Sequence, residues 1–180
     1  MQKDTFILYA KYNQAANEKM SETIRMLSAE EWDKPIGGYF NSIRGICSHI
    51  YICDFNWLKL FSKLRNFEVL SEAYFTGRKY SIQEILFEDM NEYLESRPIL
   101  DEKIIKLMDE LVYGDLNTIL NYTDSNKTAS KAIFGGLLMQ LFNHDTHHRG
   151  MISFGLELLG HKNNFSSFGA VLNDEQIRFT

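Results

Sequence analysis

A stripe of positions spaced three or four residues apart runs from Leu137 to Leu159, and it constrains the fold more than any other feature of the sequence. Its members are Leu137, Leu141, His144, His148, Met151, Gly155 and Leu159. This spacing places all seven side chains on one face of an α-helix, as in the buried seam of a helical bundle. The sequence therefore predicts a long bundle helix that stops at Gly160, because glycine commonly follows a helix C-terminus.

Two members of this stripe are histidines. His144 and His148 lie one helical turn apart, so both imidazoles can reach one metal ion. The alternative is a pair of hydrogen-bonded core histidines, but burying two of them on consecutive turns without a shared partner is costly. The pattern therefore favours a metal site. His147 lies beside the stripe, and we interpret it as a residue that flanks or supports the ligands.

Three further helices are predicted from the same kind of spacing, over about residues 3–27, 43–64 and 81–111. Pro98 is expected to kink the last of these or to divide it into two, because proline removes a helical hydrogen bond and clashes with the preceding turn. Alternating strand patterns are lacking over most of the chain. We therefore predict an all-α fold, a four-helix bundle that forms a single domain over residues 1–180.

The connections between these helices are expected to differ in character. Residues 66–79 mix aromatic and polar side chains without a clean period and are expected to form an irregular connection. Residues 116–122 lie between two turn signals and are a candidate for a short strand-like excursion before the last helix. Residues 128–131 are expected to lead directly into that helix.

Charge and hydropathy exclude several classes of partner. The formal net charge is −5, and the lysines and arginines are scattered, which argues against nucleic acid as the main partner. No apolar run approaches the roughly 20 residues needed to span a bilayer, and the first residues lack a secretion signal. We therefore expect a cytoplasmic protein with no membrane partner. Cys47 and Cys53 should point in different directions from one helix and remain free thiols.

A third candidate ligand lies on the helix predicted over residues 43–64. His49 is just off the apolar seam of this helix, where a neighbouring helix can bring a metal ion against it. The set His49, His144 and His148 suits zinc, nickel or another borderline divalent ion. Three protein ligands leave a coordination position open for water or substrate, as in catalytic sites. Cys53, one turn after His49, is an alternative fourth ligand that would close the set.

Two carboxylates lie near the candidate ligands in sequence, and two other kinds of metal site can be compared with this pattern. Asp54 and Asp145 are placed to orient ligating rings, although exposed surface carboxylates are the simpler interpretation of each. The segment from His144 to His148 resembles the helical zinc-protease motif, but Asp145 replaces the longer glutamate that serves as the general base. The Glu-x-x-His repeats of di-iron bundles are absent. Both chemistries are therefore disfavoured.

With these residues in place, most of the chain resembles the DinB family of metalloenzymes. The matching residues are Tyr12, Asn13 and Asn17; residues 40–45 with His49, Asp54 and Trp57; and, most specifically, residues 144–150. Two positions depart from the family pattern. Ala15 replaces a tryptophan that is often found there, and Met151 replaces a glutamine that commonly follows the Arg-Gly pair. If that amide shapes the pocket in relatives, substrate choice differs here.

The resemblance implies a four-helix bundle of up-down-down-up topology with a histidine triad that binds a divalent metal, carried here onto His49, His144 and His148. Relatives with known activity are similar to thiol-dependent isomerases, or to transferases that use bacillithiol, mycothiol or glutathione. A metal-bound thiol loses its proton and becomes a nucleophile near neutral pH. The expected function is therefore a metal-dependent transfer of a low-molecular-weight thiol onto a small-molecule substrate. The alternative is a non-catalytic metal-binding stress-response protein, and a homodimer is expected from the habit of the family.

Overall fold

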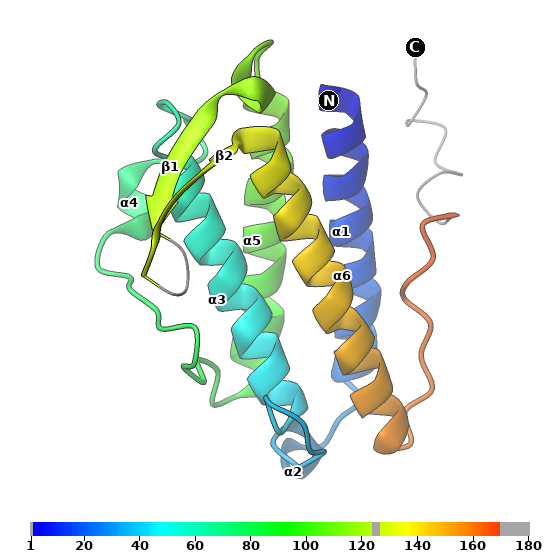
Figure 1. Ribbon diagram of the computed structural model, residues 1–180. Coiled ribbons are helices and arrows are strands. Elements are labelled where there is room, and N and C mark those ends of the chain that lie inside the picture. The colour runs from blue at the N-terminus through cyan, green and yellow to red at the C-terminus, as the bar shows by residue number, and fades with distance from the viewer. Residues whose placement is uncertain (1, 124–126, 170–180) are drawn as a thin grey trace.

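Four long helices lie side by side in the computed structural model, which describes residues 2–123 and 127–169 (Figure 1). They are α1 (Lys3–Ile24), α3 (Ile43–Phe61), α5 (Met90–Glu110) and α6 (Phe134–Leu158). In Figure 1, α1 and α6 run downward, whereas α3 and α5 run upward. Each of α1 and α3 packs against both α5 and α6. The predicted bundle and its up-down-down-up topology are confirmed.

Five short elements connect the long helices: α2 (Ala29–Trp32), α4 (Glu72–Phe75), the 3-10 helix η1 (Asp115–Asn117), and strands β1 (Ile119–Thr123) and β2 (Ala129–Ile133). The two strands are antiparallel, with Leu120 opposite Ala132. The strand-like excursion is therefore confirmed as β1. Residues 128–131 precede the last helix as predicted, but residues 129–131 belong to β2, which was not predicted, and α6 begins at Phe134.

Local capping residues explain where α3 and α5 begin. Ser42 caps α3, since its hydroxyl oxygen accepts a hydrogen bond from the Gly45 N–H at 3.1 Å. Asp89 caps α5 in the same way through the Asn91 N–H at 2.9 Å. No side chain caps α6, but the preceding hairpin fixes its first turn, where the Phe134 N–H donates to the Thr118 carbonyl at 2.8 Å.

Apolar side chains from all four helices fill the interior of the bundle. Those with no exposed surface include Met20, Ile24, Ile50, Phe55, Leu58, Leu107, Leu138 and Ile152. Burial of each such side chain stabilises the fold by about 1.5–3 kcal/mol. Helix α5 continues through Pro98 as one helix rather than two. Helix α6 ends close to the predicted position, where Gly160 adopts a φ of 91° that favours glycine.

The prediction that a helix begins near Ser81 is wrong. Residues 81–87, which we call the crossover strap, run without helical structure along α3, and α5 begins at Met90. Two α3 side chains hold the strap. The Ser48 hydroxyl oxygen accepts a hydrogen bond from the Leu86 N–H at 3.1 Å, and Arg44 Nε donates to the Phe87 carbonyl at 2.5 Å. These bonds compete with helix formation by engaging the strap backbone.

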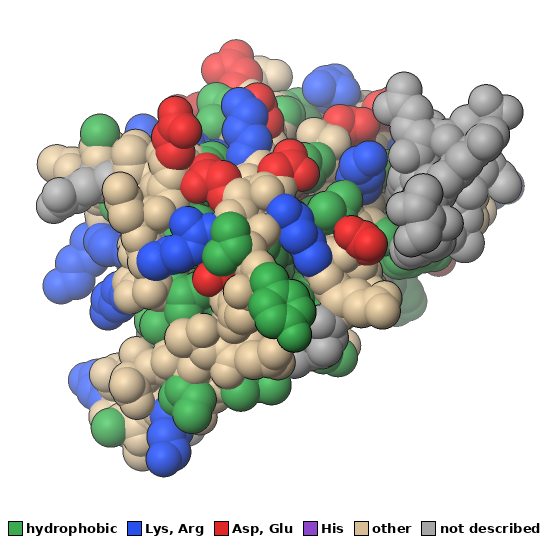
Figure 2. Space-filling view, turned by 90° about the horizontal axis from the view of Figure 1, so that it is seen from above, with side chains coloured by type: hydrophobic (Ala, Val, Ile, Leu, Met, Phe, Trp, Pro, Cys, Tyr) green, Lys and Arg blue, Asp and Glu red, His purple; other side chains and the backbone are tan. Residues whose placement is uncertain are grey.

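Acidic and basic side chains intermingle at the end of the bundle where the hairpin meets α6. Figure 2 looks onto this end and shows red and blue side chains side by side, without a continuous basic patch on the visible face. Charges of both signs are therefore mixed on this face. Among the described helices, none combines the length and the apolar character needed to cross a membrane.

Candidate metal centre

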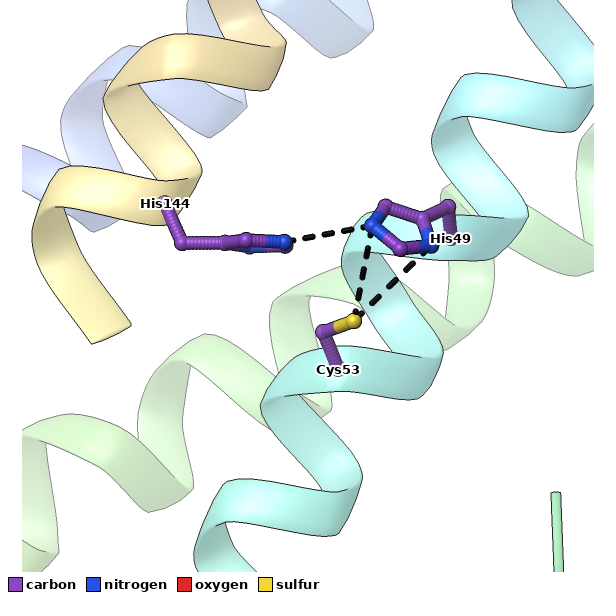
Figure 3. Close-up of side chains that lie close together, drawn as sticks. All are labelled: His49, Cys53 and His144. Carbon is purple, nitrogen blue, oxygen red and sulfur yellow. Dashed lines mark hydrogen bonds between the residues drawn. The ribbon is translucent and has the colours of Figure 1, made fainter. Parts of the chain in front are cut away.

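Helices α3 and α6 bring three predicted ligands together at their interface. The Nε2 atoms of His49 on α3 and His144 on α6 lie 3.1 Å apart (Figure 3). The ring of His148 is centred 4.7 Å from that of His49 and 4.3 Å from that of His144. Residues almost one hundred positions apart in sequence therefore form one cluster of imidazoles.

Cys53 joins this cluster from the next turn of α3. Its Sγ atom lies 3.6 Å from His49 Nε2 and 3.8 Å from His49 Nδ1. Donor atoms of His49, Cys53 and His144 all lie within 4.8 Å of one another, close enough to hold one metal ion. Figure 3 shows both α3 side chains on the side of the helix that faces His144. His148 is not part of this tightest group within the described residues.

The crossover strap orients the His49 ring. His49 Nδ1 lies 3.2 Å from the Ile82 carbonyl oxygen, and a carbonyl can only accept a hydrogen bond. The proton of a neutral His49 therefore resides on Nδ1, which leaves the Nε2 lone pair directed toward His144. Metal-ligating histidines commonly donate their other N–H to a carbonyl in this way.

The protonation of the rings suits a metal. Burial lowers the pKa of His49, and the neighbouring His144 lowers it further. Burial also lowers the pKa of His148 to about 3, with added contributions from His144 and His49. Both rings are thus neutral near pH 7, the form that binds metal ions. His148 Nδ1 is also buried without a hydrogen-bond partner in the described structure. No hydrogen bond among the described residues therefore competes with a metal ion for this nitrogen.

Cys53 differs from the histidines in its protonation. Burial raises the pKa of the Cys53 thiol to about 12, and the nearby Asp54 and Asp145 add to the effect. In the metal-free protein this sulfur therefore carries a proton, which a bound cation would have to displace. Cys47 lies deeper in the core and has no exposed surface. Both cysteines are free thiols, as predicted.

Asp54 and Asp145 are fully buried, so their interpretation as surface carboxylates is wrong. Burial and the neighbouring Asp145 raise the pKa of Asp54 well above its ordinary value. Burial also acts to raise the pKa of Asp145, but His144, Arg97 and Arg149 outweigh it and hold this pKa below its usual value. Asp145 Oδ1 lies 3.9 Å from His144 Nδ1, on the side of the ring away from His49.

A buried polar network extends from these carboxylates through all four long helices. Its members, each at most 3% exposed, are Asn13, Asn17, Asp54, Arg97, Asp101, Asp145 and Arg149. Arg97 binds both Asp54 and Asp101, and Asn17 Nδ2 donates to Asp101 at 2.9 Å. Arg149 donates to Asn13 and Asn17. The network anchors the α6 turn that carries His144 and His148 to the remaining helices.

Sequence reasoning did not single out Arg97 or Asp101 as site residues. The available signal was their spacing, since they lie four residues apart on the helix face that also carries the apolar seam residues Leu94 and Ile104. His147 was interpreted as a flanking residue, and its exposed side chain lies beside the cluster, with its ring centred 4.8 Å from that of His148.

A cavity of about 190 Å³ adjoins the cluster on the strap side. Its lining residues are Tyr39, Phe40, Gly45, His49, Ile82, Gln83, Glu84 and Ile85. The Phe40 ring is centred 4.4 Å from the His49 ring and 5.3 Å from the His148 ring. The lining is mainly apolar, contains no lysine or arginine, and includes one carboxylate. An uncharged apolar group therefore fits this cavity better than an anion.

The fold and the cluster define a helical-bundle protein with a histidine-rich candidate metal centre between α3 and α6. The model of the DinB family matches residues 1–173, and the chain belongs to this family. It is 26% identical to Protein DinB of Bacillus subtilis over 174 residues, which cover 93% of this chain and 92% of that protein. A crystal structure of a DinB-like protein from Bacillus subtilis shares the fold, with a TM-score of 0.62 at 14% identity over 88% of this chain and 97% of that chain.

Proposed function

We propose that the chain binds one divalent metal ion through His49, His144 and His148 and transfers a low-molecular-weight thiol, of the bacillithiol or glutathione type, onto a small molecule. The observation that carries the proposal is the 3.1 Å approach of the His49 and His144 Nε2 atoms, with the His148 ring beside them. Two imidazole nitrogens this close suit a shared cation.

A bound metal would supply one chemical effect, which is to lower the pKa of a coordinated thiol so that it reacts as a thiolate near neutral pH. The residues of the chain would orient the metal ligands and bind the substrate. The Ile82 carbonyl holds the His49 ring, and the cavity beside Tyr39 and Phe40 receives the apolar electrophile. Because Glu84 disfavours anions there, we place the carboxylate-bearing thiol outside this cavity.

Metal binding without catalysis is the second candidate, and one observation favours it. Cys53 Sγ groups with donor atoms of His49 and His144, and the His148 ring lies beside them, so the chain offers four candidate ligands, the number typical of closed structural metal sites. Under this proposal the protein would hold metal in the cytoplasm as part of a stress response. A homodimer is a further proposal, and a monomer mass by light scattering would contradict it.

Two measurements test the proposed function. Elemental analysis of protein purified without an affinity tag should find about one zinc, nickel or other divalent transition metal per chain. Absence of such metal after supplementation would contradict the site. Conjugation of a neutral aromatic electrophile with bacillithiol or glutathione should then depend on that metal. Full metal occupancy with no conjugation of either thiol would favour the non-catalytic alternative.

A further inference from the structure

The distances between the donor atoms of His49, His144 and Cys53 are close to those in a tetrahedral zinc site. Zinc binds imidazole nitrogen at about 2.0–2.1 Å and thiolate sulfur at about 2.3 Å. A tetrahedral arrangement therefore places two nitrogens about 3.3 Å apart, and a nitrogen and a sulfur about 3.6 Å apart. The corresponding distances are 3.1 Å between the His49 and His144 Nε2 atoms and 3.6 Å between Cys53 Sγ and His49 Nε2. Both distances are compatible with coordination of one ion, and Cys53 Sγ lies within 4.8 Å of a ligand nitrogen of His144.

The helix explains why the sulfur is in this place. Cys53 is four residues after His49 on α3, so both side chains leave the helix on the same side. Figure 3 shows Cys53 Sγ next to the His49 ring, with both of its dashed contacts to His49 nitrogens. The polar contacts of this sulfur are to His49, whereas Cys47 is turned into the core against Tyr93. The two cysteines of one helix therefore have different surroundings.

We propose that the Cys53 thiolate is the fourth protein ligand of the metal centre and holds the position that an incoming thiol takes. This inference rests on the proposed histidine site. An incoming thiol would take the place of Cys53 at the bound ion, and Cys53 Sγ would accept the proton that the incoming thiol gives up. One thiolate replaces another, so the charge of the site is unchanged. A sulfur ligand also favours zinc over harder divalent ions.

Cobalt(II) bound to the full-length protein provides the test, because cobalt coordinated by thiolate absorbs in the near ultraviolet through charge transfer from sulfur, and cobalt coordinated by imidazole alone does not. The metal-free wild-type chain, titrated with cobalt in the absence of any added thiol, should develop this band at one cobalt per chain. Cys53→Ser should bind cobalt without the band. Cys47→Ser is the matched control, and its cobalt complex should keep the band.

The outcomes separate this inference from the proposed function. A wild-type cobalt complex without the band overturns the role of Cys53 and leaves the three-histidine site intact. A band that persists in Cys53→Ser overturns it as well. No cobalt binding by the wild type overturns both proposals.

A second experiment adds a monothiol such as 2-mercaptoethanol to the cobalt complex of Cys53→Ser. The added thiol should restore the band, because the vacated position accepts external sulfur. A band that does not return after the thiol is added would overturn the proposed exchange of ligands. If the serine variant does not fold, Cys53→Ala is used for the same measurement.

Discussion

Arg97 on α5 and Asp54 on α3 form an ion pair in the middle of the bundle, with Nη1 and Oδ2 2.6 Å apart and both side chains fully enclosed. The same guanidinium binds Asp101 one turn further along α5, through Nη2 at 2.5 Å and Nε at 3.1 Å. Asp54 directly follows Cys53 in the chain. This cation therefore fixes α5 against the turn of α3 that carries one of the candidate ligands.

Loss of the Arg97 guanidinium should destabilise the fold strongly. Arg97→Met keeps much of the side-chain volume but leaves Asp54 and Asp101 buried without their cation. Breaking a buried pair in this way costs about 3–5 kcal/mol. Urea unfolding of the metal-free chain measures the change. The matched control is Lys106→Met, which removes the exposed pair of Lys106 with Glu102 and should cost at most about 1 kcal/mol. Equal losses in the two variants would contradict a stabilising role for the network.

A methyl group at Gly45 should disturb the metal centre. Its Cβ would overlap the backbone carbonyl oxygen of Phe40, whose ring packs against His49 and His148. We expect Gly45→Ala to lose about 1–3 kcal/mol of stability through overpacking and to bind metal more weakly, because the Phe40 ring must move. Chemical unfolding and a chelator competition titration measure the two effects.

The control for that variant is Gly150→Ala on α6, where an added Cβ meets no atom within 4 Å. Alanine favours the helix over glycine, so this variant should gain up to about 1 kcal/mol and retain its metal affinity. A Gly45→Ala protein that behaves like Gly150→Ala would show that Phe40 does not shape the site.

The bundle was predictable because its helices repeat apolar residues at helical spacing. The grouping of His49 with His144 and His148 was predicted as well, whereas the 3.1 Å distance between the His49 and His144 Nε2 atoms was not, because it depends on how α3 packs on α6. The interpretation of Asp54 and Asp145 failed for a related reason. A sequence does not show whether water or a buried arginine compensates a carboxylate, and for Asp54 the compensating residue, Arg97, lies more than forty positions away.

The local errors have local causes. Strand β2 was missed because its five residues, Ala129–Ile133, are too few to show a clear periodicity, and it forms by pairing with β1. The helix predicted from Ser81 was wrong although its capping contact exists, since the Ser81 N–H does bind the Glu84 side chain at 3.1 Å. Hydrogen bonds from the strap backbone to Ser48 and Arg44 prevail over that local signal.

Zinc binding should release about one proton per chain near pH 7 if Cys53 is a ligand. The pKa of Cys53, about 12, means that the free thiol holds a proton that zinc displaces. The lowered pKa values of His49 and His148 mean that these rings are already neutral and release no proton when they bind zinc. The affinity of the protein for zinc should therefore rise about tenfold per pH unit above neutrality. Calorimetry in two buffers of different ionisation enthalpy counts the protons. Cys53→Ser should release fewer, and equal release by both proteins would exclude the thiol as their source.

Alanine substitution of the four histidines near the site should weaken zinc binding to different extents. His49→Ala, His144→Ala and His148→Ala each remove a proposed ligand, so we expect each to weaken zinc binding by more than about 100-fold. His147 has an exposed side chain next to His148, and His147→Ala should cost at most about 10- to 100-fold, the scale of residues that support a ligand. Competition with a chromophoric chelator measures all four affinities, and far-ultraviolet circular dichroism verifies that each variant is folded. Should His147→Ala lose the metal while His148→Ala retains it, the ligands would belong to the neighbouring face of α6. In that case the inward-facing position of His148 would serve packing, and the metal centre would have to lie outside the interface of α3 and α6.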